Sequence, residues 1–175
     1  MAAYLYRMGA GFPGDINRTH PVSVEPALID VNSPPTAYGQ PVLVDATTQG
    51  VRPFAAGDQS NTVASAPWGW TARAFPTQQA QTNQNYGAVA FGSVAPPVSG
   101  QIDVMTSGYM MVQLPSGQTS VKGGAVYVWC AASTGVHVLG GIESAASAGN
   151  TTQLSYAFFN GSPDSSGNVE IRYNT

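Results

Sequence analysis

The amino-acid sequence predicts an all-β protein, a jelly-roll-like β-sandwich or small barrel with an extended Pro/Gly-rich N-terminal arm. Three observations carry this prediction. Short runs alternate apolar and polar residues at a period of two, the spacing of strands with one buried face. Glycine, proline and serine separate these runs at close intervals, and no pattern long enough for an ordinary helix occurs. Roughly eight to ten short strands are expected.

The 175 residues are enough for one all-β domain, which we place at residues 41–175. Residues 1–40 are predicted to be an extended arm. Glycine and proline break any regular element over 9–14, and four further prolines follow up to Pro35. A long surface loop laid over its own domain is the alternative.

The regular pattern begins after Gln40. Residues 42–44 and 51–54 predict a hairpin, with Pro53 indicating an edge strand. Residues 68–74 predict a strand that carries two tryptophans, at 68 and 70, on one face. Residues 88–91 predict a further short strand before a proline pair.

The central stretch, 101–141, has the strongest pattern. Five apolar residues share one parity and predict one buried face: Ile102, Val104, Met110, Val112 and Leu114. Residues 126–130 are apolar on both faces, which is typical of a strand inside a sandwich or under a partner subunit. A turn at 133–135 follows, and alternation is predicted to resume over 136–142.

Two strands close the chain. Residues 155–159 predict one, and a loop over 162–167 leads to the other. Val169, Ile171 and Tyr173 alternate there with polar residues, which predicts an amphipathic strand that ties down the terminus.

The composition excludes several partners. Charged residues make up only 9% of the chain, against roughly a quarter in ordinary soluble domains. The six basic residues are scattered and the net charge is −3, so a nucleic-acid partner is not expected. A membrane partner is not expected either, because no apolar run approaches the roughly 18 residues of a span. The only apolar run at the start contains Arg7, unlike a secretory signal, so the protein is expected to be made in a cytoplasm and either kept there or assembled there into something larger.

No stretch predicts a chemical site. Residues 9–14 match G-x-G-x-x-G, but the prolines that follow forbid the helix that dinucleotide binding needs. His20 and His137 lack a second ligand at metal spacing, and His137 is expected to face solvent or an interface. Cys130 lies in an apolar strand, where its pKa would be raised, so it predicts a buried thiol and not a nucleophile. We therefore expect no enzyme, no cofactor and no metal.

Several segments resemble the cement (decoration) proteins of tailed-bacteriophage capsids. They are YLYRMGAGFPGDINR at the start, RAFPTQ, GGAVYVWC followed by GVHVLGGIESA, and AFFNGSPDSSGNVEIRYN at the end. The resemblance rests on their order and spacing and covers most of the chain. It implies a structural protein on the outer capsid surface of the virion, which bridges neighbouring major capsid protein subunits. It also implies a homo-oligomer, a dimer or trimer at symmetry axes.

The candidate contact residues are aromatic or arginine side chains of the arm and of two strands. Each aromatic has core packing as its alternative role, and Arg7 and Arg18 are candidates to pair with capsid carboxylates. The candidates are Tyr4, Tyr6, Arg7, Phe12, Arg18, Trp68, Trp70, Tyr127 and Trp129.

A second function remains open. A carbohydrate- or receptor-binding jelly-roll module of a phage tail or spike would use Trp68 and Trp70 to stack on sugar rings.

Overall fold

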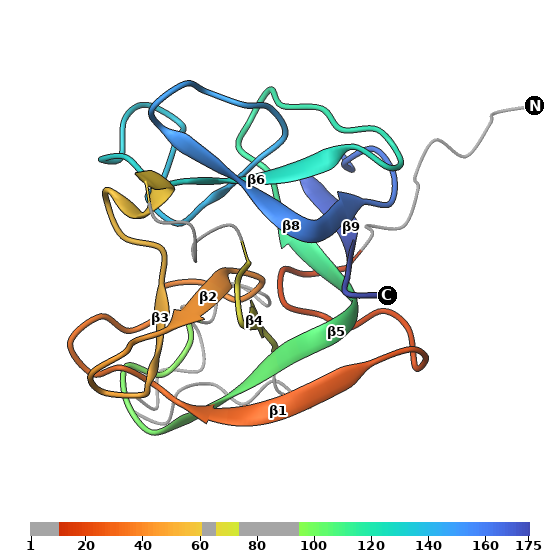
Figure 1. The fold of residues 1–175 in the computed structure, drawn as a ribbon. Helices are drawn as coiled ribbons and strands as arrows, with labels where there is room; N and C mark the ends of the chain where they lie inside the picture. The colour runs from red at the N-terminus through yellow and green to blue at the C-terminus, as the bar shows by residue number, and fades with distance from the viewer. Residues whose placement is uncertain (1–10, 61–65, 74–94) are drawn as a thin grey trace, which may run out of the picture.

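The protein is built from β-strands throughout the part of the chain that the structure describes. The computed structural model describes residues 11–60, 66–73 and 95–175 (Figure 1). The elements are β1 (Ser23–Leu28), β2 (Pro41–Val44), β3 (Val51–Pro53), the 3₁₀ turn η1 (Asp58–Ser60), β4 (Gly69–Thr71), β5 (Gln101–Gln113), β6 (Ala125–Trp129), β7 (Ile142–Glu143), β8 (Thr151–Phe159) and β9 (Asn168–Tyr173). No helix among these residues is long and apolar enough to cross a membrane. The predicted all-β, jelly-roll-like class is confirmed.

β5 is shared by two groups of strands. Its first half pairs with β1 on one edge and with β4 on the other, and its second half pairs with β9. The order across the sheet is β3-β2-β4-β5-β9-β8-β6-β7, with β1 also on β5, and the pairings of the described strands are antiparallel. Gly108 lies at the junction with φ 140°, a conformation that favours glycine.

The first group forms a small barrel from β1, β3, β2, β4 and residues 101–107 of β5, at the bottom of Figure 1. The ring is closed just beyond β1, where Ile29 forms a parallel bridge with Val51 and the Asp30 amide donates to the Val51 carbonyl at 3.0 Å. Its interior is a compact aliphatic cluster of Ile29, Val42, Val51, Ile102 and Val104.

The second group is a curved open sheet, formed by residues 108–113 of β5 with β9, β8, β6 and β7, at the top of Figure 1. Its inner face meets the outside of the small barrel in a larger cluster. That cluster contains Leu43, Phe54, Trp70, Ala72, Met105, Met110, Val112, Leu114, Val126, Val128, Cys130, Ile142, Leu154, Ala157, Phe159, Val169, Ile171 and Tyr173. The other side of the open sheet is called the outer face below.

Strands between the two clusters are buried on both sides. In β2, Val42 packs inside the small barrel and Leu43 packs in the larger cluster; in β5, Val104 and Met105 divide in the same way. Successive side chains of a strand point to opposite faces, so both parities must be apolar here.

Most predicted strands are confirmed, including the hairpin of β2 and β3 and the alternation of β9. The prediction for 88–91 lies outside the described residues. Two face assignments are wrong. Trp68 precedes β4 and packs against the barrel cluster, whereas Trp70 lies in the larger cluster. The apolar parity of β5 is buried against two clusters, because β5 changes partners near Gly108.

The strand predicted over 136–142 is also wrong. An isolated bridge between Thr134 and His137 makes a tight turn there, and regular pairing begins only with β7. The turn leaves Val136 and Val138 exposed at 52% and 56%. Alternation over such a short span did not distinguish a turn from a strand.

Two parts of residues 11–40 pair with β5, namely residues 14–17 and β1. β1 is part of this segment, and Pro26 fits within it because β1 is an edge strand of β5. This geometry is closer to the alternative of a segment laid over its own domain. The boundary at residue 40 stays a prediction, and residues 1–10 lie outside the described residues.

Candidate interaction surfaces

The segment before β1 is held on the sheet as a strap, which we define as residues 11–18. It pairs with the edge of β5 that β9 leaves open. The Gly14 amide donates to the Met111 carbonyl at 2.8 Å, and the Met111 amide donates to the Asp15 carbonyl at 2.9 Å. The strap is therefore a preordered surface segment that carries Phe12 and Arg18.

Arg73 fixes the start of the strap. Its guanidinium donates to the Pro13 carbonyl at 3.1 and 3.3 Å and lies 3.5 Å from Asp15. It also lies between two rings, 5.0 Å from the centroid of Tyr38 and 5.8 Å from that of Phe12. The Arg73 side chain is only 5% exposed, whereas Phe12 remains 46% exposed. One buried cation thus supports an aromatic ring that faces solvent.

Arg18 fixes the end of the strap on the outer face. Its guanidinium lies 4.1 Å from the Tyr109 ring centroid and pairs with Glu170 of β9 at 2.8 Å. Asn160 also donates to Glu170. Burial alone raises the pKa of Glu170, but the hydrogen bonds from Arg18 and Asn160 outweigh it, so its pKa lies below the ordinary value.

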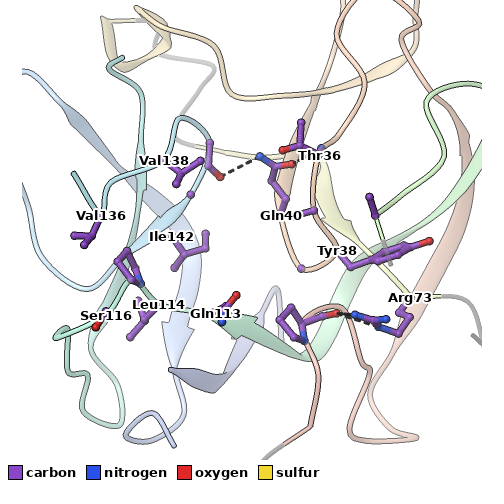
Figure 2. Close-up of a pocket in the computed structure, with 17 residues that line it drawn as sticks. Thr36, Tyr38, Gln40, Arg73, Gln113, Leu114, Ser116, Val136, Val138 and Ile142 are labelled. Atoms are coloured by element: carbon purple, nitrogen blue, oxygen red, sulfur yellow. Dashed lines mark hydrogen bonds between the residues drawn. The ribbon is translucent and has the colours of Figure 1, made fainter. Parts of the chain in front are cut away.

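A groove of about 460 Å³ opens beside the strap (Figure 2). Val136, Val138 and Ile142 lie on one side of it, and Thr36 and Gln40 lie on the other. The Gln40 side chain crosses between the two sides, since its amide donates to the Gly140 carbonyl at 3.4 Å. Of the described lining residues, Tyr38 and Arg73 are the ionisable ones. The groove offers apolar contact and a few hydrogen bonds, and these residues do not include an acid–base pair.

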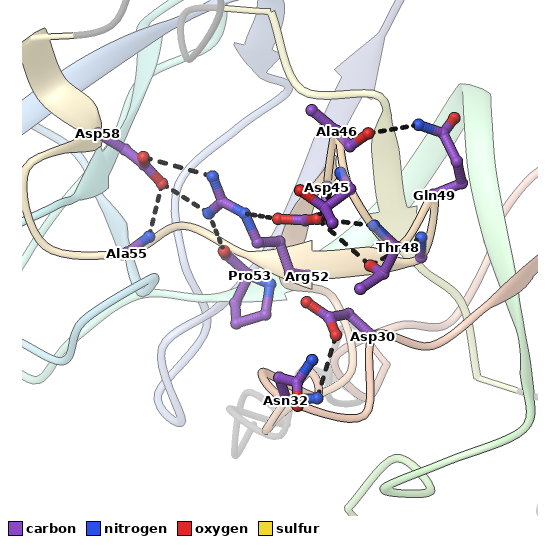
Figure 3. Close-up of polar contacts among 12 residues, drawn as sticks. Asp30, Asn32, Asp45, Ala46, Thr48, Gln49, Arg52, Pro53, Ala55 and Asp58 are labelled. Carbon is purple, nitrogen blue, oxygen red and sulfur yellow. Dashed lines mark hydrogen bonds and ion pairs between the residues drawn. The ribbon is translucent and has the colours of Figure 1, made fainter.

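The densest charge cluster is structural (Figure 3). Arg52 pairs with Asp58 at 2.8 Å and with Asp45 at 3.7 Å. Asp45 accepts from the amides of Thr47 and Thr48 and so closes the turn between β2 and β3, while Asp58 accepts from the Ala55 amide. No cluster of His, Cys, Asp and Glu suited to a metal occurs among the described residues.

Cys130 and His137 both take part in packing in this structure. Cys130 is buried, and burial raises the pKa of its thiol. His137 was predicted to face solvent or an interface, but it is half-buried. Its ring stacks on Trp129 at 4.3 Å, and its Nδ1 lies 2.8 Å from Glu143 Oε1. This pair fastens the loop that carries Val136 and Val138.

The structure brings two of the predicted contact residues together on the strap, Phe12 and Arg18. Tyr4, Tyr6 and Arg7 lie outside the described residues. The other four are placed as follows: Trp68 is half-buried, Trp70 is fully buried against Tyr173, Tyr127 is half-buried on the outer face, and Trp129 lies on that face beneath His137.

This placement removes the basis of the sugar-binding alternative, which needed an exposed tryptophan pair. Trp70 is 0% exposed and Trp68 faces a different cluster. Arg73, Tyr109 and Glu170 hold the strap in place, and sequence reasoning missed all three roles. Their partners lie far away in the chain, and no local pattern marks them.

Comparison with known proteins identifies the class to which this architecture belongs. A family model described as the XM1 gp53 minor capsid protein matches residues 1–173. The chain belongs to this family. It also resembles a solved chain from "The capsid of Myoviridae Phage XM1", with a TM-score of 0.67 and 15% identity over 99% of this chain and 96% of that one. That likeness shows a shared fold. No match was found among curated proteins.

Membership of the gp53 minor capsid family identifies a phage capsid-associated protein with a structural role in the virion, whose partners are other capsid components. The resemblance to phage capsid proteins is thereby confirmed. The strap, the groove and the outer face are candidate surfaces for such contacts.

Proposed function

We propose that the chain is a cement protein on the outer surface of the capsid, where it bridges neighbouring major capsid protein subunits and stabilises the shell. The preordered strap is the observation that carries the proposal. An exposed aromatic ring and an exposed guanidinium are presented on backbone that is already hydrogen-bonded to β5, so little conformational entropy is lost on binding.

The surface composition favours a protein that works bound to other proteins over one that works unbound in solution. Ten large apolar side chains of the described residues are exposed in a chain with 9% charged residues. They are distributed over both the small barrel and the open sheet, so a single copy offers contacts to more than one neighbour. Several weak contacts made together raise overall avidity steeply.

Capsids assembled without the protein test the proposal. We expect purified chain to co-sediment with them, to appear on the outer surface by cryo-electron microscopy, and to raise the temperature at which the shell opens. Removal of residues 1–10 leaves the strap intact and is expected to weaken attachment through loss of Tyr4, Tyr6 and Arg7. A chain that does not bind, or one found only inside the shell or on tails, would refute the cement role.

Phe12→Ala tests the strap itself. The Phe12 ring is exposed, so we expect an unchanged circular dichroism spectrum together with weaker capsid binding. Val121→Ala is the matched control, because Val121 is a more exposed apolar residue, at 69%, and is not part of the strap.

A further inference from the structure

The outer face of the open sheet carries a row of aromatic and arginine side chains across three strands. Tyr109 of β5 lies opposite Arg172 of β9, and Phe158 of β8 lies opposite Arg172 on the other edge. The Arg172 guanidinium is 5.0 Å from the Phe158 ring centroid, and that of Arg18 is 4.1 Å from the Tyr109 ring. We call Arg18, Tyr109, Arg172 and Phe158 the outer row.

The inner residues of the same strands identify this side as the exposed one. Val169, Ile171 and Tyr173 of β9 all lie in the larger cluster, so Glu170 and Arg172 point away from it. Tyr109 and Phe158 are half-buried and Arg172 is exposed. Half-buried Tyr127 on β6 extends the face beyond β8.

Arg172 and Arg18 differ in how their charge is used. Arg18 is paired with Glu170. For Arg172, the described part of the chain supplies no carboxylate within ion-pair distance and no side-chain hydrogen bond. A guanidinium flanked by an aromatic ring keeps its in-plane donors available for two parallel hydrogen bonds to a carboxylate.

β8, which carries Phe158, has an irregularity that leaves a second ring exposed. Tyr156 of β8 has φ 62°, a left-handed conformation that is rare for an aromatic residue. Its register with β6 shifts at this point, and the Asn174 amide beside Arg172 donates to the Tyr156 carbonyl at 3.2 Å. The shift lets both Leu154 and Ala157 face the core and leaves Tyr156 67% exposed.

An ordinary solvated face explains these features less well. Such faces are rich in Lys, Glu and Asp, whereas arginine and aromatic residues are enriched at the centres of binding interfaces. The exposed carboxylates Glu25 and Asp103 belong to the small barrel, so the two halves of the molecule differ in the charge that they present.

We infer that the outer row is the seat of a carboxylate-bearing surface segment of the major capsid protein, with Arg172 binding the carboxylate and Tyr109, Phe158 and Tyr156 making the apolar contacts. This inference rests on the proposed cement role and names the surface and the charge of its partner. Arg172 has no carboxylate partner in the described part of the chain, so charge complementarity favours an acidic occupant.

Arg172→Gln tests the inference on capsids that lack the protein. We expect the apparent affinity of this variant to fall at least about tenfold. Its affinity should also decrease less steeply with rising salt than that of the wild type. Arg172→Lys keeps the charge but loses the bidentate geometry, so its apparent affinity should lie between those of the wild type and Arg172→Gln. Lys122→Gln is the control, since it removes the same charge from an exposed turn outside the row. All variants should keep the wild-type melting temperature.

The outcomes separate the two proposals. Failure of wild-type chain to bind the shell refutes the cement role. Binding by wild-type chain that Arg172→Gln leaves unchanged, or changes no more than Lys122→Gln, refutes the outer row alone. A change in self-association by sedimentation velocity, with shell binding intact, would show that the occupant is a second copy and would also overturn the inference.

Discussion

The small barrel and the open sheet share one strand, β5, but differ in how much of their surface is closed off. The barrel closes through the bridge of Ile29 to Val51 and hides both its aliphatic interior and most of its strand edges. The open sheet buries its inner face against the larger cluster, while its outer face carries the outer row, in which Arg18 and Arg172 are exposed and Tyr109 and Phe158 are half-buried. Closure removes edges that could pair with other chains, whereas an open sheet keeps a rigid face for partners. The barrel is thus closed on itself, whereas the sheet presents one broad face to its surroundings.

Trp70→Ala is expected to have the largest effect, because this side chain joins the two halves. Trp70 is fully buried in the larger cluster with its ring 6.1 Å from that of Tyr173. Truncation should lower the free energy of unfolding by about 3–5 kcal/mol. Guanidinium unfolding monitored by circular dichroism should remain a single transition, since β5 runs through both halves. Two separate transitions would show that barrel and sheet fold independently.

Gly39→Ala should loosen the strap without touching the barrel interior. Gly39 has φ 72°, and a Cβ there would lie 2.9 Å from both Gly14 N and Met111 O, which are backbone atoms. We expect a loss of about 1–3 kcal/mol in chemical denaturation. Gly57→Ala is the matched control, because φ is 92° there and a Cβ at this position would have no atom within 4 Å. Equal losses in both variants would mean that the close approach at the strap contributes nothing.

Tyr156→Asn should separate strain from contact on the open sheet. Asparagine tolerates the left-handed conformation better than tyrosine, so the free energy of unfolding should rise by a few tenths of a kcal/mol. Tyr156→Phe keeps both ring and conformation and should leave stability unchanged. A clear destabilisation by Asn in thermal melts would show that the ring is packed and is not held out for a partner.

Acid should weaken the anchor between strap and outer face, with the smallest effect of the four. The pKa of Glu170 is depressed in the folded chain, so its contribution is fully present above the ordinary pKa of 4.5 and is lost as pH falls through the folded pKa. The stability difference between wild type and Glu170→Gln should therefore shrink below about pH 4.5 in urea titrations. A difference that stays constant down to about pH 3 would contradict the assignment.

Sequence reasoning succeeded where a strand is buried on one face only. The alternation in β9 assigned every residue to the correct side. The assignment of Val126 and Val128 of β6, and of Cys130 just after it, to the core side was also correct. It failed where tertiary context decides the face. Nothing local shows that β5 changes partners near Gly108, or that Trp68 lies just outside β4.

The candidate surfaces were less predictable than the fold. Phe12 and Arg18 were proposed as contact residues from residue type and position in the arm, but the sequence did not show that Arg18 pairs with Glu170, at the other end of the chain. The outer row exists only once β5, β9 and β8 are placed in register. Single residues such as Arg172 look like ordinary surface charges until their cross-strand neighbours are known.

The continuity of β5 has a mechanical consequence. Thirteen residues of one strand, about 40 Å if fully extended, carry the ladders of both halves. A load applied to the sheet by an expanding shell would pass along this strand into the barrel as shear, so that several ladder hydrogen bonds resist together and none is opened alone. The two halves, although they present different surfaces, would then resist such a load as one unit.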